Sequence, residues 1–423
     1  MNRECVLFLF FMSMQFSACL LPPQFQWKVI DFAWHGEHKQ AALASGAYIP
    51  ENNMPTGLAR WRDKLFITIP RWKRGVPSSL NYVYVNGSQQ QPLIPYPSWG
   101  DAFISDDACC VSTNSTVVSA FRIHVDKCDR LWVVDNGVTD MYNHVQQIAP
   151  PAILIFDLKR HSLKHKHFFS DEVLRDSSVF TNIVVDIVDQ DCNNAYAYIA
   201  DMGSGALMVY DLRNDMTWRI ESPLFQHQQN ASVYKVGGVE FFWNDGVSSV
   251  ALSQKKSDGH RDLYCHATSS TRLLKISTKL LRNPYVNSGD IQNGIKIVGE
   301  RGPLSQSTAC DYDEGTNVLF YTQLSRNGVG CWNLDRKFTE ENTPLLVSDC
   351  NVLEFPNDIK VDPEGNVWIL SDRQSRFLYD QMNFEQTNFR VLTAKASILI
   401  SGSRCRMSPL EKAMNYIKSP KSA

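Results

Sequence analysis

FPNDIKVDPEGNVWILSDR (residues 355–373) shows the pattern that decides the fold of this chain. An apolar run leads into a turn of Asp, Pro, Glu, Gly and Asn, and a second apolar run follows and ends on polar residues. Small polar residues tolerate the backbone angles of a tight turn, and β-branched and aromatic residues favour strands, so the stretch predicts a β-hairpin. Five further stretches of this kind begin at residues 54, 118, 180, 236 and 306.

The six hairpins recur at similar distances along the chain. Successive turns lie 50 to 69 residues apart when the turns are marked by Asp63, Cys128, Cys192, Asp245, Glu314 and Glu364. A third apolar run follows each hairpin, at 79–85, 152–158, 206–212, 271–277, 330–334 and, more weakly, 377–380. A unit of this size holds the four short strands of one propeller blade. We therefore predict an all-β fold, a six-bladed β-propeller with a central channel, in preference to two unrelated β-sandwiches.

The repeat also sets the expected domain organisation. Length alone would divide 423 residues into two or three domains, but blades cannot bury their faces alone, so the ring is one unit. FQWKVIDF (residues 25–32) reads as a strand ahead of the first blade, and we expect it to close the ring by pairing into the last blade. The propeller is expected over residues 20–405, followed by a basic, flexible tail over 406–423.

The first 19 residues have the features of a secretion signal. Arg3 precedes the apolar run 6–11, and the small residues Ser17 and Cys19 stand before the expected cleavage point. The apolar run is too short to span a bilayer. We therefore expect residues 1–19 to be removed and the protein to be secreted to the extracellular space.

Composition limits the partners. The formal net charge is −2, which gives no electrostatic footprint for nucleic acid or an anionic membrane, and we expect neither as a partner. Hydrophobic residues make up 43% and aromatic residues 11%, enough for a large buried core. Three sequons are expected glycosylation sites in an extracellular protein: Asn86, Asn114 and Asn230.

Eleven cysteines point to disulfides in a secreted chain. Nine remain after loss of Cys5 and Cys19, so at least one thiol is unpaired or bonded between chains. Two cysteines occupy the same hairpin turn in neighbouring blades, and a pair near the end would tie the C-terminal segment to the fifth blade. The expected disulfides are Cys128–Cys192 and Cys331–Cys405. No cysteine spacing matches a structural zinc site.

The first strands of the six units should begin at one mouth of the channel, where loops from all the blades converge. The residues at these positions are Pro55, Thr56, Ala120, Phe121, Thr181, Asn182, Gly237, Gly238, Ser307, Thr308, Asn357 and Asp358. This set, rich in hydroxyl and amide groups, favours a planar aromatic ligand held by hydrogen bonds, with an ammonium group paired to Asp358. The alternative is that these groups cap strand ends and brace neighbouring loops.

Other clusters are candidates for metal ligands. His165 and His167 share one face of an expected outer strand, where a solvated surface is the alternative to a metal site. Four carboxylates could bind calcium, although most belong to turns: Asp126, Asp186, Asp189 and Asp191. We expect no metal and no cofactor. The chain has no GxSxG, HExxH or phosphate-loop motif, which excludes the common hydrolase and kinase chemistries.

Several segments resemble a known family. They are PENNMPTGLARWRDKLFITIPRWKRGVPSSLNYV (50–83), DKCDRLWVVDNG (126–137), AYIADMG (197–203), GCWN (330–333) and FPNDIKVDPEGNVWILSDR (355–373). The chain resembles the insect yellow and major royal jelly protein family from about residue 25 to residue 405. The resemblance implies a secreted six-bladed propeller with a ligand in the central channel, near 330–333 and 355–358. Members act in melanin formation and cuticle colour, bind biogenic amines or serve as food proteins.

The resemblance implies an L-dopachrome isomerase as the first functional hypothesis. Dopachrome rearranges by losing a ring proton, so the protein must position a base and stabilise the shifting charge, and Asp358 is the candidate base. Amides and hydroxyls would orient the quinone oxygens and phenyl rings would stack on the ligand: Asn357, Asn182, Thr181, Thr308, Phe121 and Phe355. The alternative is a non-catalytic binder of catecholamines or biogenic amines, or a structural cuticle pigment protein, which needs the channel but no base.

Overall fold

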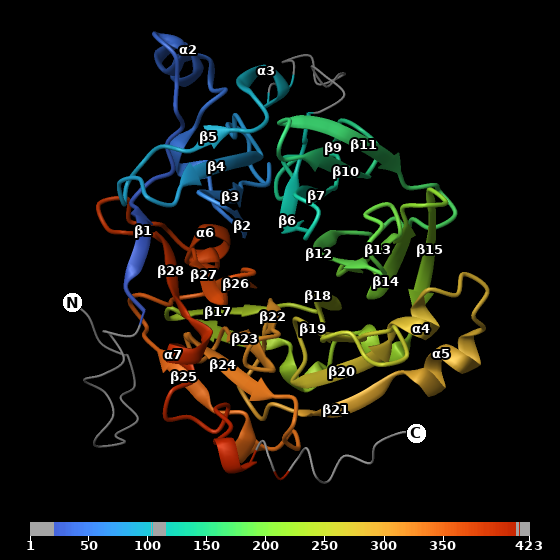
Figure 1. Ribbon diagram of the computed structural model, residues 1–423. Coiled ribbons are helices and arrows are strands. Elements are labelled where there is room, and N and C mark those ends of the chain that lie inside the picture. Colours follow the sequence, from blue (N-terminus) through green and yellow to red (C-terminus); the bar gives the residue numbers. More distant parts are fainter. Residues whose placement is uncertain (1–20, 103, 105–115, 412–413, 415–423) are drawn as a thin grey trace.

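The structure, a computed structural model, describes residues 21–102, 104, 116–411 and 414. Its main sheets are six four-stranded antiparallel blades around one axis, so the predicted six-bladed β-propeller is confirmed (Figure 1). The first three blades, each given from the axis outward, are β2 (Gly57–Trp61), β3 (Lys64–Thr68), β4 (Leu80–Tyr84) and β5 (Ile94–Pro95); β6 (Ala120–Val125), β7 (Arg130–Asp135), β10 (Ala152–Asp157) and β11 (Ser162–Phe168); and β12 (Phe180–Ile187), β13 (Ala195–Asp201), β14 (Ala206–Asp211) and β15 (Met216–Glu221).

The last three blades complete the ring. They are β18 (Val247–Leu252), β19 (Asp262–Ala267), β20 (Arg272–Ser277) and β21 (Lys296–Glu300); β22 (Cys310–Asp313), β23 (Val318–Gln323), β24 (Gly328–Asn333) and β25 (Leu345–Ser348); and β26 (Pro356–Val361), β27 (Asn366–Ser371), β28 (Phe389–Lys395) and β1 (Pro23–Trp27). The inner strands contact one another in the order β2, β6, β12, β18, β22 and β26, and β26 contacts β2 again. The ring is therefore closed on the inside.

Shorter elements fill the connections. Two small hairpins stand outside the blades: β8 (Val138–Thr139) with β9 (Gln146–Gln147), and β16 (Val233–Val236) with β17 (Val239–Phe242). The helices are α2 (His38–Ser45), α3 (Trp99–Ala102), α4 (Thr278–Leu281), α5 (Ser288–Gly294), α6 (Gln374–Tyr379), α7 (Ala396–Leu399) and the short 3-10 turns Pro50–Asn52, Pro223–Phe225, Gln229–Ala231 and Glu340–Asn342. Among the described residues, no helix is long and apolar enough to cross a lipid bilayer.

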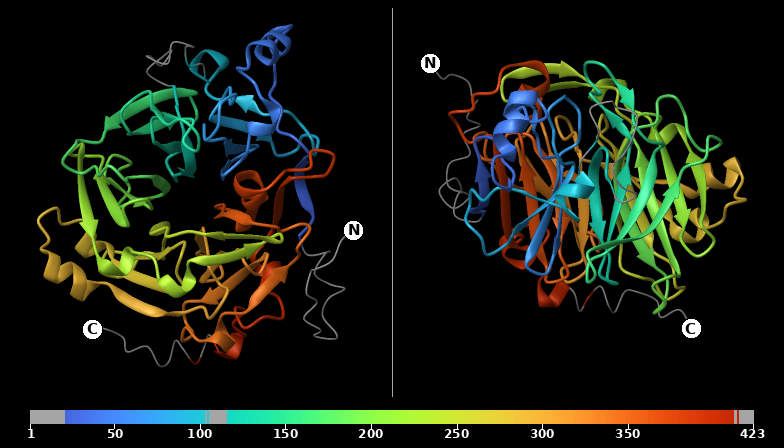
Figure 2. Two further views of the ribbon diagram at one scale, coloured as in Figure 1. Left: turned by 180° about the vertical axis from the view of Figure 1, so that it is seen from behind. Right: turned by 90° about the horizontal axis from the view of Figure 1, so that it is seen from above.

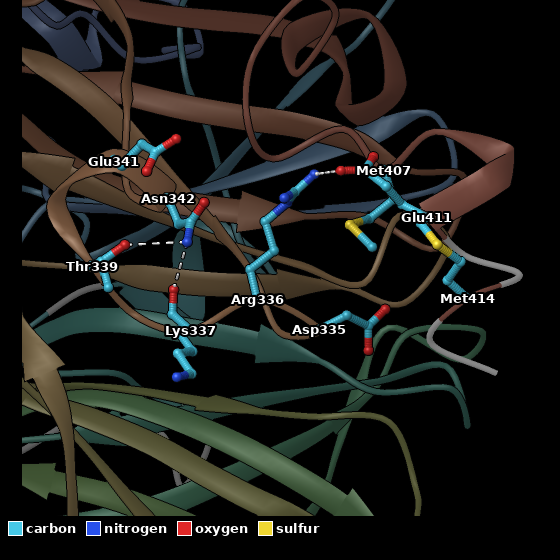
Figure 3. A pocket seen from close by; sticks show the side chains of 9 residues that line it. All are labelled: Asp335, Arg336, Lys337, Thr339, Glu341, Asn342, Met407, Glu411 and Met414. Atoms are coloured by element: carbon cyan, nitrogen blue, oxygen red, sulfur yellow. Dashed lines mark hydrogen bonds and ion pairs between the residues drawn. The ribbon is translucent and has the colours of Figure 1, made fainter. Parts of the chain in front are cut away.

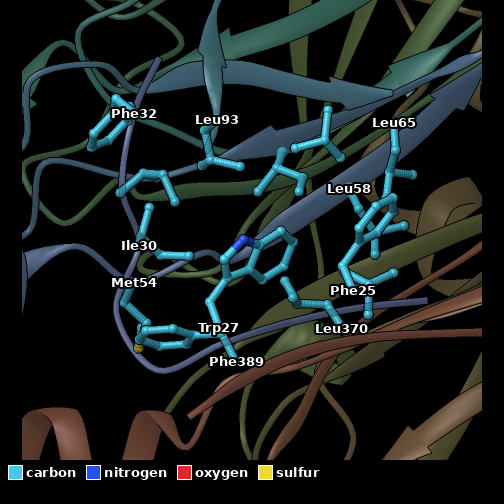
Figure 4. Packing of buried hydrophobic residues seen from close by; sticks show 14 of the residues in the cluster. Phe25, Trp27, Ile30, Phe32, Met54, Leu58, Leu65, Leu93, Leu370 and Phe389 are labelled. Atoms are coloured by element: carbon cyan, nitrogen blue, oxygen red, sulfur yellow. The ribbon is translucent and has the colours of Figure 1, made fainter. Parts of the chain in front are cut away.

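The N-terminal strand closes the last blade, as the sequence predicted. β1 pairs antiparallel with β28, with Trp27 opposite Phe389, so the last blade takes its outer strand from the start of the chain. The Trp27 indole donates a hydrogen bond to Gln91 O in the first blade at 2.9 Å. Figure 4 shows Trp27 within the cluster of buried apolar side chains where the first and last blades meet. Pairing removes the exposed edge of β28 and locks the ring at its seam.

A repeated side-chain bond fixes two of the hairpin turns. The Asp126 carboxylate accepts the backbone N–H of Cys128 and the indole N–H of Trp132, the latter at 2.7 Å. Asp362 repeats this with the indole of Trp368 at 2.8 Å. The spacing of six residues from Asp to Trp brings the two side chains together because the Asp begins the turn and the Trp lies on the returning strand. The polar residue in the turn therefore sets the register of the hairpin.

Two blades differ from the sequence prediction. The stretch that begins at Val236 was predicted to be the first hairpin of blade 4, but it forms β17, outside the blade, and then β18, the first strand of the blade. The blade hairpin turns near Asp258 instead. Residues 377–380, predicted as the third strand of blade 6, lie in and after α6, and β28 supplies that strand. The apolar pattern was misleading in both cases, because the inserted segments, β16–β17 and α6, carry apolar side chains that pack over one end of the ring.

The two predicted disulfides are present. Cys128 bonds to Cys192 between the hairpin turns of blades 2 and 3, and Cys331 bonds to Cys405. Among the described residues, Cys265 and Cys310 are buried free thiols. Directly after Cys405 the chain packs on the propeller: Met407 is buried, and Glu411 forms an ion pair with Arg336 at 2.6 Å.

The seam leads to a stability prediction. Replacing Trp27 by Ala should lower the free energy of unfolding by about 3–5 kcal/mol, because it opens a cavity between the first and last blades. Urea denaturation followed by fluorescence or circular dichroism measures the change. Lys28→Ala, at a neighbouring side chain that is 57% exposed, is the matched control and should unfold like the wild type. An equal effect of both variants would contradict closure of the ring through Trp27.

Candidate functional site

The inner strands begin at one end of the ring, here called the mouth, and hydrogen bonds join each blade to the next there. In blade 2 the joining side chain is Asn136, which directly follows β7. The joints are Thr56 Oγ1 to Phe121 O (3.1 Å), the Asn136 amide to the N–H and C=O of Phe180 (2.8 and 2.9 Å), Thr181 Oγ1 to Ser248 O (3.2 Å), Ser248 Oγ to Thr308 O (3.5 Å), Thr308 Oγ1 to Asn357 O (2.7 Å) and Leu58 N–H to the Asp358 carboxylate (3.0 Å). We call these six side chains the joint ring: Thr56, Asn136, Thr181, Ser248, Thr308 and Asp358. They satisfy backbone groups that adjacent blades would otherwise leave unpaired.

β-Bulges at the start of four inner strands change the direction of the side chains there. The pairing register shifts at the start of the inner strand in blades 2, 3, 4 and 6, at Phe121–Arg122, Thr181, Ser248 and Asn357. A β-bulge leaves one residue unpaired and re-aims its side chain, and bulges are frequent beside functional sites. Ser248 was missed by the sequence analysis, which placed Gly237 and Gly238 at this position of blade 4.

The predicted ligand-binding residues come together at the mouth, but in this structure they are covered. Each is at most 8% exposed: Asn357, Asn182, Thr181, Phe121, Thr308 and Phe355. The hydroxyls of Thr181 and Thr308 are used in the joint ring, which is the bracing role set against ligand binding in the sequence analysis. These residues therefore form the floor of the mouth.

Asp358 is held in a buried ion pair. Its carboxylate lies 3.1 Å from Nε of Arg122, accepts the N–H groups of Leu58 and Ile359, and is fully buried. Arg122 also donates to the backbone and side-chain oxygens of Asn357 at 2.7 and 2.8 Å. Each oxygen of the Asp358 carboxylate is engaged, which favours a positioning role over the predicted role of base.

A second buried carboxylate belongs to this group. Asp372 accepts from the Asn357 amide and from the backbone N–H of Gln374, and burial raises its pKa well above the usual range. The positive charge of Arg122 acts against this rise, so the one guanidinium influences both buried acids, Asp358 and Asp372.

Deeper along the axis, a side chain spans the ring. Lys360 on β26 donates to the Asn182 side chain on β12, the inner strand of the opposite blade, at 3.1 Å. Burial, and then the nearby Lys360, lower the pKa of His124 to about 3, so its ring is neutral at physiological pH. Asp311 lies near the same amine, and burial raises its pKa to about 6 while its oxygens accept the N–H groups of Val361 and Tyr312. This polar layer crosses the channel and meets the floor of the mouth at Asn182.

Aromatic side chains stand above the floor. Tyr142 packs edge-on against Trp72 at 5.4 Å, and Trp72 lies 4.7 Å from Phe121 on β6. Across the mouth, the indole N–H of Trp243 donates to the Tyr379 hydroxyl at 2.5 Å. We call Trp72, Tyr142, Trp243 and Tyr379 the aromatic rim; its members come from the loops of blades 1, 2 and 6 and from the segment that leads into blade 4.

Two of the four rim side chains are open to water, whereas Trp72 is buried like the floor. Tyr142 and Tyr379 are 47% and 49% exposed. Burial, followed by the Asp245 carboxylate and the Tyr379 hydroxyl, nevertheless raises the pKa of Tyr142. Tyr142 and Tyr379 therefore offer exposed aromatic surface for stacking at the mouth.

The hairpin β16–β17 covers part of the mouth. Phe241 on β17 stacks on Tyr379 at 5.3 Å, and Arg376 on α6 donates to Gly237 O at the hairpin tip at 2.7 Å. Figure 1 shows α6 and β17 side by side near the middle of the ring, and Figure 2 shows the yellow-green hairpin at one end of the blades. Phe355 lies beneath it with a φ of 58°, a strained conformation for a bulky residue of the kind that clusters at functional sites.

Asp245 follows this hairpin and was not predicted as a site residue. The sequence analysis took it as a turn marker; with Asp258 as the fourth turn the spacings become 66 and 56 residues instead of 53 and 69, which is the signal that was missed. Its backbone is held by Ser269, which accepts the Asp245 N–H and donates to Asp245 O. Burial raises the pKa of Asp245 to about 6.

Other predicted clusters lie away from the mouth. GCWN (residues 330–333), which the family resemblance placed near the ligand, is on β24, the third strand of its blade, and is buried there. His165 and His167 both bond Asp215, at 3.0 and 2.8 Å, on the outer edge of blade 2. Within residues 21–102, 104, 116–411 and 414, no group of three or more His, Cys, Asp or Glu could hold a metal ion.

The carboxylates considered for calcium have other partners. Asp126 anchors its turn, and Asp186 pairs with Arg261 and Arg282. Asp189 and Asp191 lie in the exposed turn that follows β12. These carboxylates do not converge on one point, and the calcium alternative is therefore not supported.

The predicted glycosylation sites and a cavity on the outside of blade 5 lie away from the mouth. Asn86 and Asn230 are exposed, as a glycan requires, and Asn114 lies outside the described residues. A cavity of about 400 Å³ lies on the outside of blade 5, and Figure 3 shows the side chains that line it, where Arg336 meets Glu411. It is lined mostly by charged and polar side chains and lies against the C-terminal segment, far along the blade from the inner strands.

Comparison with known proteins identifies the family. The family model described as major royal jelly protein matches residues 118–405. The Dopaminechrome tautomerase of Drosophila melanogaster is 32% identical over 94% of this chain and 86% of its own length, and the L-dopachrome tautomerase yellow-f of the same species is 31% identical over 90% and 93%. Protein yellow of Drosophila yakuba is 33% identical over 93% of this chain and 72% of its length. The chain therefore belongs to the major royal jelly protein family, together with the yellow proteins that its sequence motifs resemble.

Proposed function

We propose that this protein is an isomerase of the melanin pathway that converts L-dopachrome to dihydroxyindoles. The observation that carries the proposal is the similarity, over nine-tenths of the chain, to two relatives named as tautomerases of dopachrome and dopaminechrome. The mouth supports it, because exposed aromatic rings stand above a floor of amides and hydroxyls. A flat, polar, aromatic ligand matches that combination.

The ligand is placed in the aromatic rim and not in the channel itself. The joint ring and the Lys360–Asn182 bond fill the axis with paired polar groups, so entry would break several buried hydrogen bonds. Each broken bond leaves an unsatisfied group that costs about 1–3 kcal/mol. Stacking on Tyr142 or Tyr379 requires no such loss.

Asp358 is proposed as a positioning residue. By holding Arg122, and through it Asn357, it fixes the floor on which the ligand rests. The proposed extracellular location depends on residues 1–19, which lie outside the described residues, and on the relationship to the yellow proteins. The two exposed sequons and the two disulfides are consistent with export.

The first test is the loss of L-dopachrome in the presence of the purified secreted protein. We expect a saturable acceleration over heat-inactivated protein, with a dihydroxyindole identified as the product by chromatography. Dopaminechrome is tested in parallel, because it lacks the carboxylate and shows whether that group is recognised. A rate equal to the spontaneous one would refute the isomerase and leave the amine-binding or structural role, which calorimetry with dopamine would then examine.

The role of Asp358 gives a separate prediction. Asp358→Asn should lower the free energy of unfolding by about 3–5 kcal/mol, because it leaves the Arg122 charge buried without its partner. Activity per folded molecule should fall by less than tenfold. Urea denaturation and kinetics measured on the same preparation test both parts, with Glu314→Gln at an exposed turn as the control. Unchanged stability with a loss of activity of 100-fold or more would restore Asp358 as the base.

A further inference from the structure

The segment that leads into blade 4 places an unpartnered carboxylate at the mouth. Asp245 is partly exposed, and its side chain makes no hydrogen bond or ion pair with any residue that the structure describes. The carboxylates beneath it are engaged: Asp358 by Arg122 and Asp372 by Asn357. A general base needs a free oxygen that a substrate can reach, and among these three acids only Asp245 provides it.

The backbone around Asp245 is rigidly held. Ser269 binds both its N–H and its carbonyl, Gly246 donates to Met202 O at 3.1 Å, and Thr268 donates to Gly246 O at 3.1 Å. A Cβ atom on Gly246 would lie 2.7 Å from Gly205, so glycine is required for this close approach to blade 3. The carboxylate is therefore presented from a fixed point and not from a mobile loop.

The groups around the carboxylate are phenols. Tyr142 comes from the loop between β8 and β9 and Tyr234 from β16, and the negative charge of the Asp245 carboxylate is one cause of the raised pKa of each. Tyr234 also hydrogen-bonds Ser269 at 2.8 Å, which keeps its hydroxyl beside the Asp245 backbone. No Lys, Arg or His contributes to the pKa of Asp245 among the described residues, and its rise to about 6 comes from burial.

We propose that Asp245 is the base that removes the proton from the ring carbon of the aminochrome while the aromatic rim holds the ring. This inference rests on the proposed function. The electron pair of the broken C–H bond moves into the ring and onto one quinone oxygen, which takes up a proton. The adjacent C–H bond, or the C–CO₂ bond with release of CO₂, then breaks, and its electron pair makes the ring aromatic while the second oxygen is protonated. The reaction is redox-neutral and needs no oxidant.

The pH dependence follows from the base form. Asp245 must be ionised to accept a proton, and the folded pKa of about 6 means that kcat/KM should rise with pH through 6 and level off above 7. In Asp245→Asn this limb should disappear and kcat should fall by about 10²–10⁴-fold, the usual contribution of a general base, with KM little changed. The spontaneous rate is subtracted at each pH.

A stability measurement supplies a second readout. A carboxyl whose pKa is raised on folding destabilises the folded state once the pH is above its unfolded pKa, so Asp245→Asn should raise Tm at pH 7.5. The gain should shrink as the pH falls through 6 towards 4. A residue with a purely structural role would lower Tm on replacement at every pH.

The controls distinguish failure of the Asp245 assignment from failure of the proposed isomerase function. Glu240→Gln changes an exposed carboxylate on the outer side of β17 and should keep the wild-type rate and pH profile. If the wild type itself does not accelerate the reaction, the proposed function fails. If the wild type is active and Asp245→Asn keeps its rate, or keeps the limb near pH 6, the assignment of Asp245 is overturned and Asp311 becomes the group to examine.

Discussion

The hydrogen bonds that pass from each blade to the next at the mouth are the constraint on which the rest of the molecule depends. Six sheets that meet at an axis bring backbone N–H and C=O groups together where water is scarce, and each needs a partner. Short side chains with a hydroxyl, an amide or a carboxylate meet that need, from Thr56 around to Asp358. The same requirement that builds the ring therefore uses up the polar groups at the start of its strands.

Charge at the centre follows from this arrangement. Arg122 and Lys360 enter the axis because carbonyl, amide and carboxylate oxygens already converge there, and each bonds a strand of another blade. Buried ion pairs are poor sources of net stability, but breaking one is costly, so they define a single arrangement of the blades. A channel filled in this way is a rigid support with no room for a ligand between its paired groups, so the proposed ligand site lies at its mouth.

The sequence revealed the parts of the molecule that repeat. Hairpin turns, the closing strand at the N-terminus and the Cys128–Cys192 bond follow from comparing one unit with the next, because equivalent positions lie at equivalent places in the ring. The site was harder to predict. Thr181 and Thr308 were correctly placed at the mouth, but a sequence cannot show which of two roles a hydroxyl takes, bracing a neighbouring strand or facing a ligand. The sequence analysis did not identify Asp245 as a site residue, because the segment around it has the same apolar–turn–apolar pattern as a blade hairpin.

The position of Asp245 outside the repeat has a physical reason. Within the blades, the polar groups of the joint ring are hydrogen-bonded across to neighbouring strands, and a group that is fully paired has little capacity left to exchange protons with a substrate. An inserted segment is free of that demand: β16–β17 packs through Phe241 on α6, and the chain then returns to β18 with one carboxylate left without a partner. Keeping this carboxylate desolvated destabilises the folded protein. The fold tolerates that cost because the joint ring already closes the propeller without help from the inserted segment. Reactivity and stability are thus assigned to different parts of one chain.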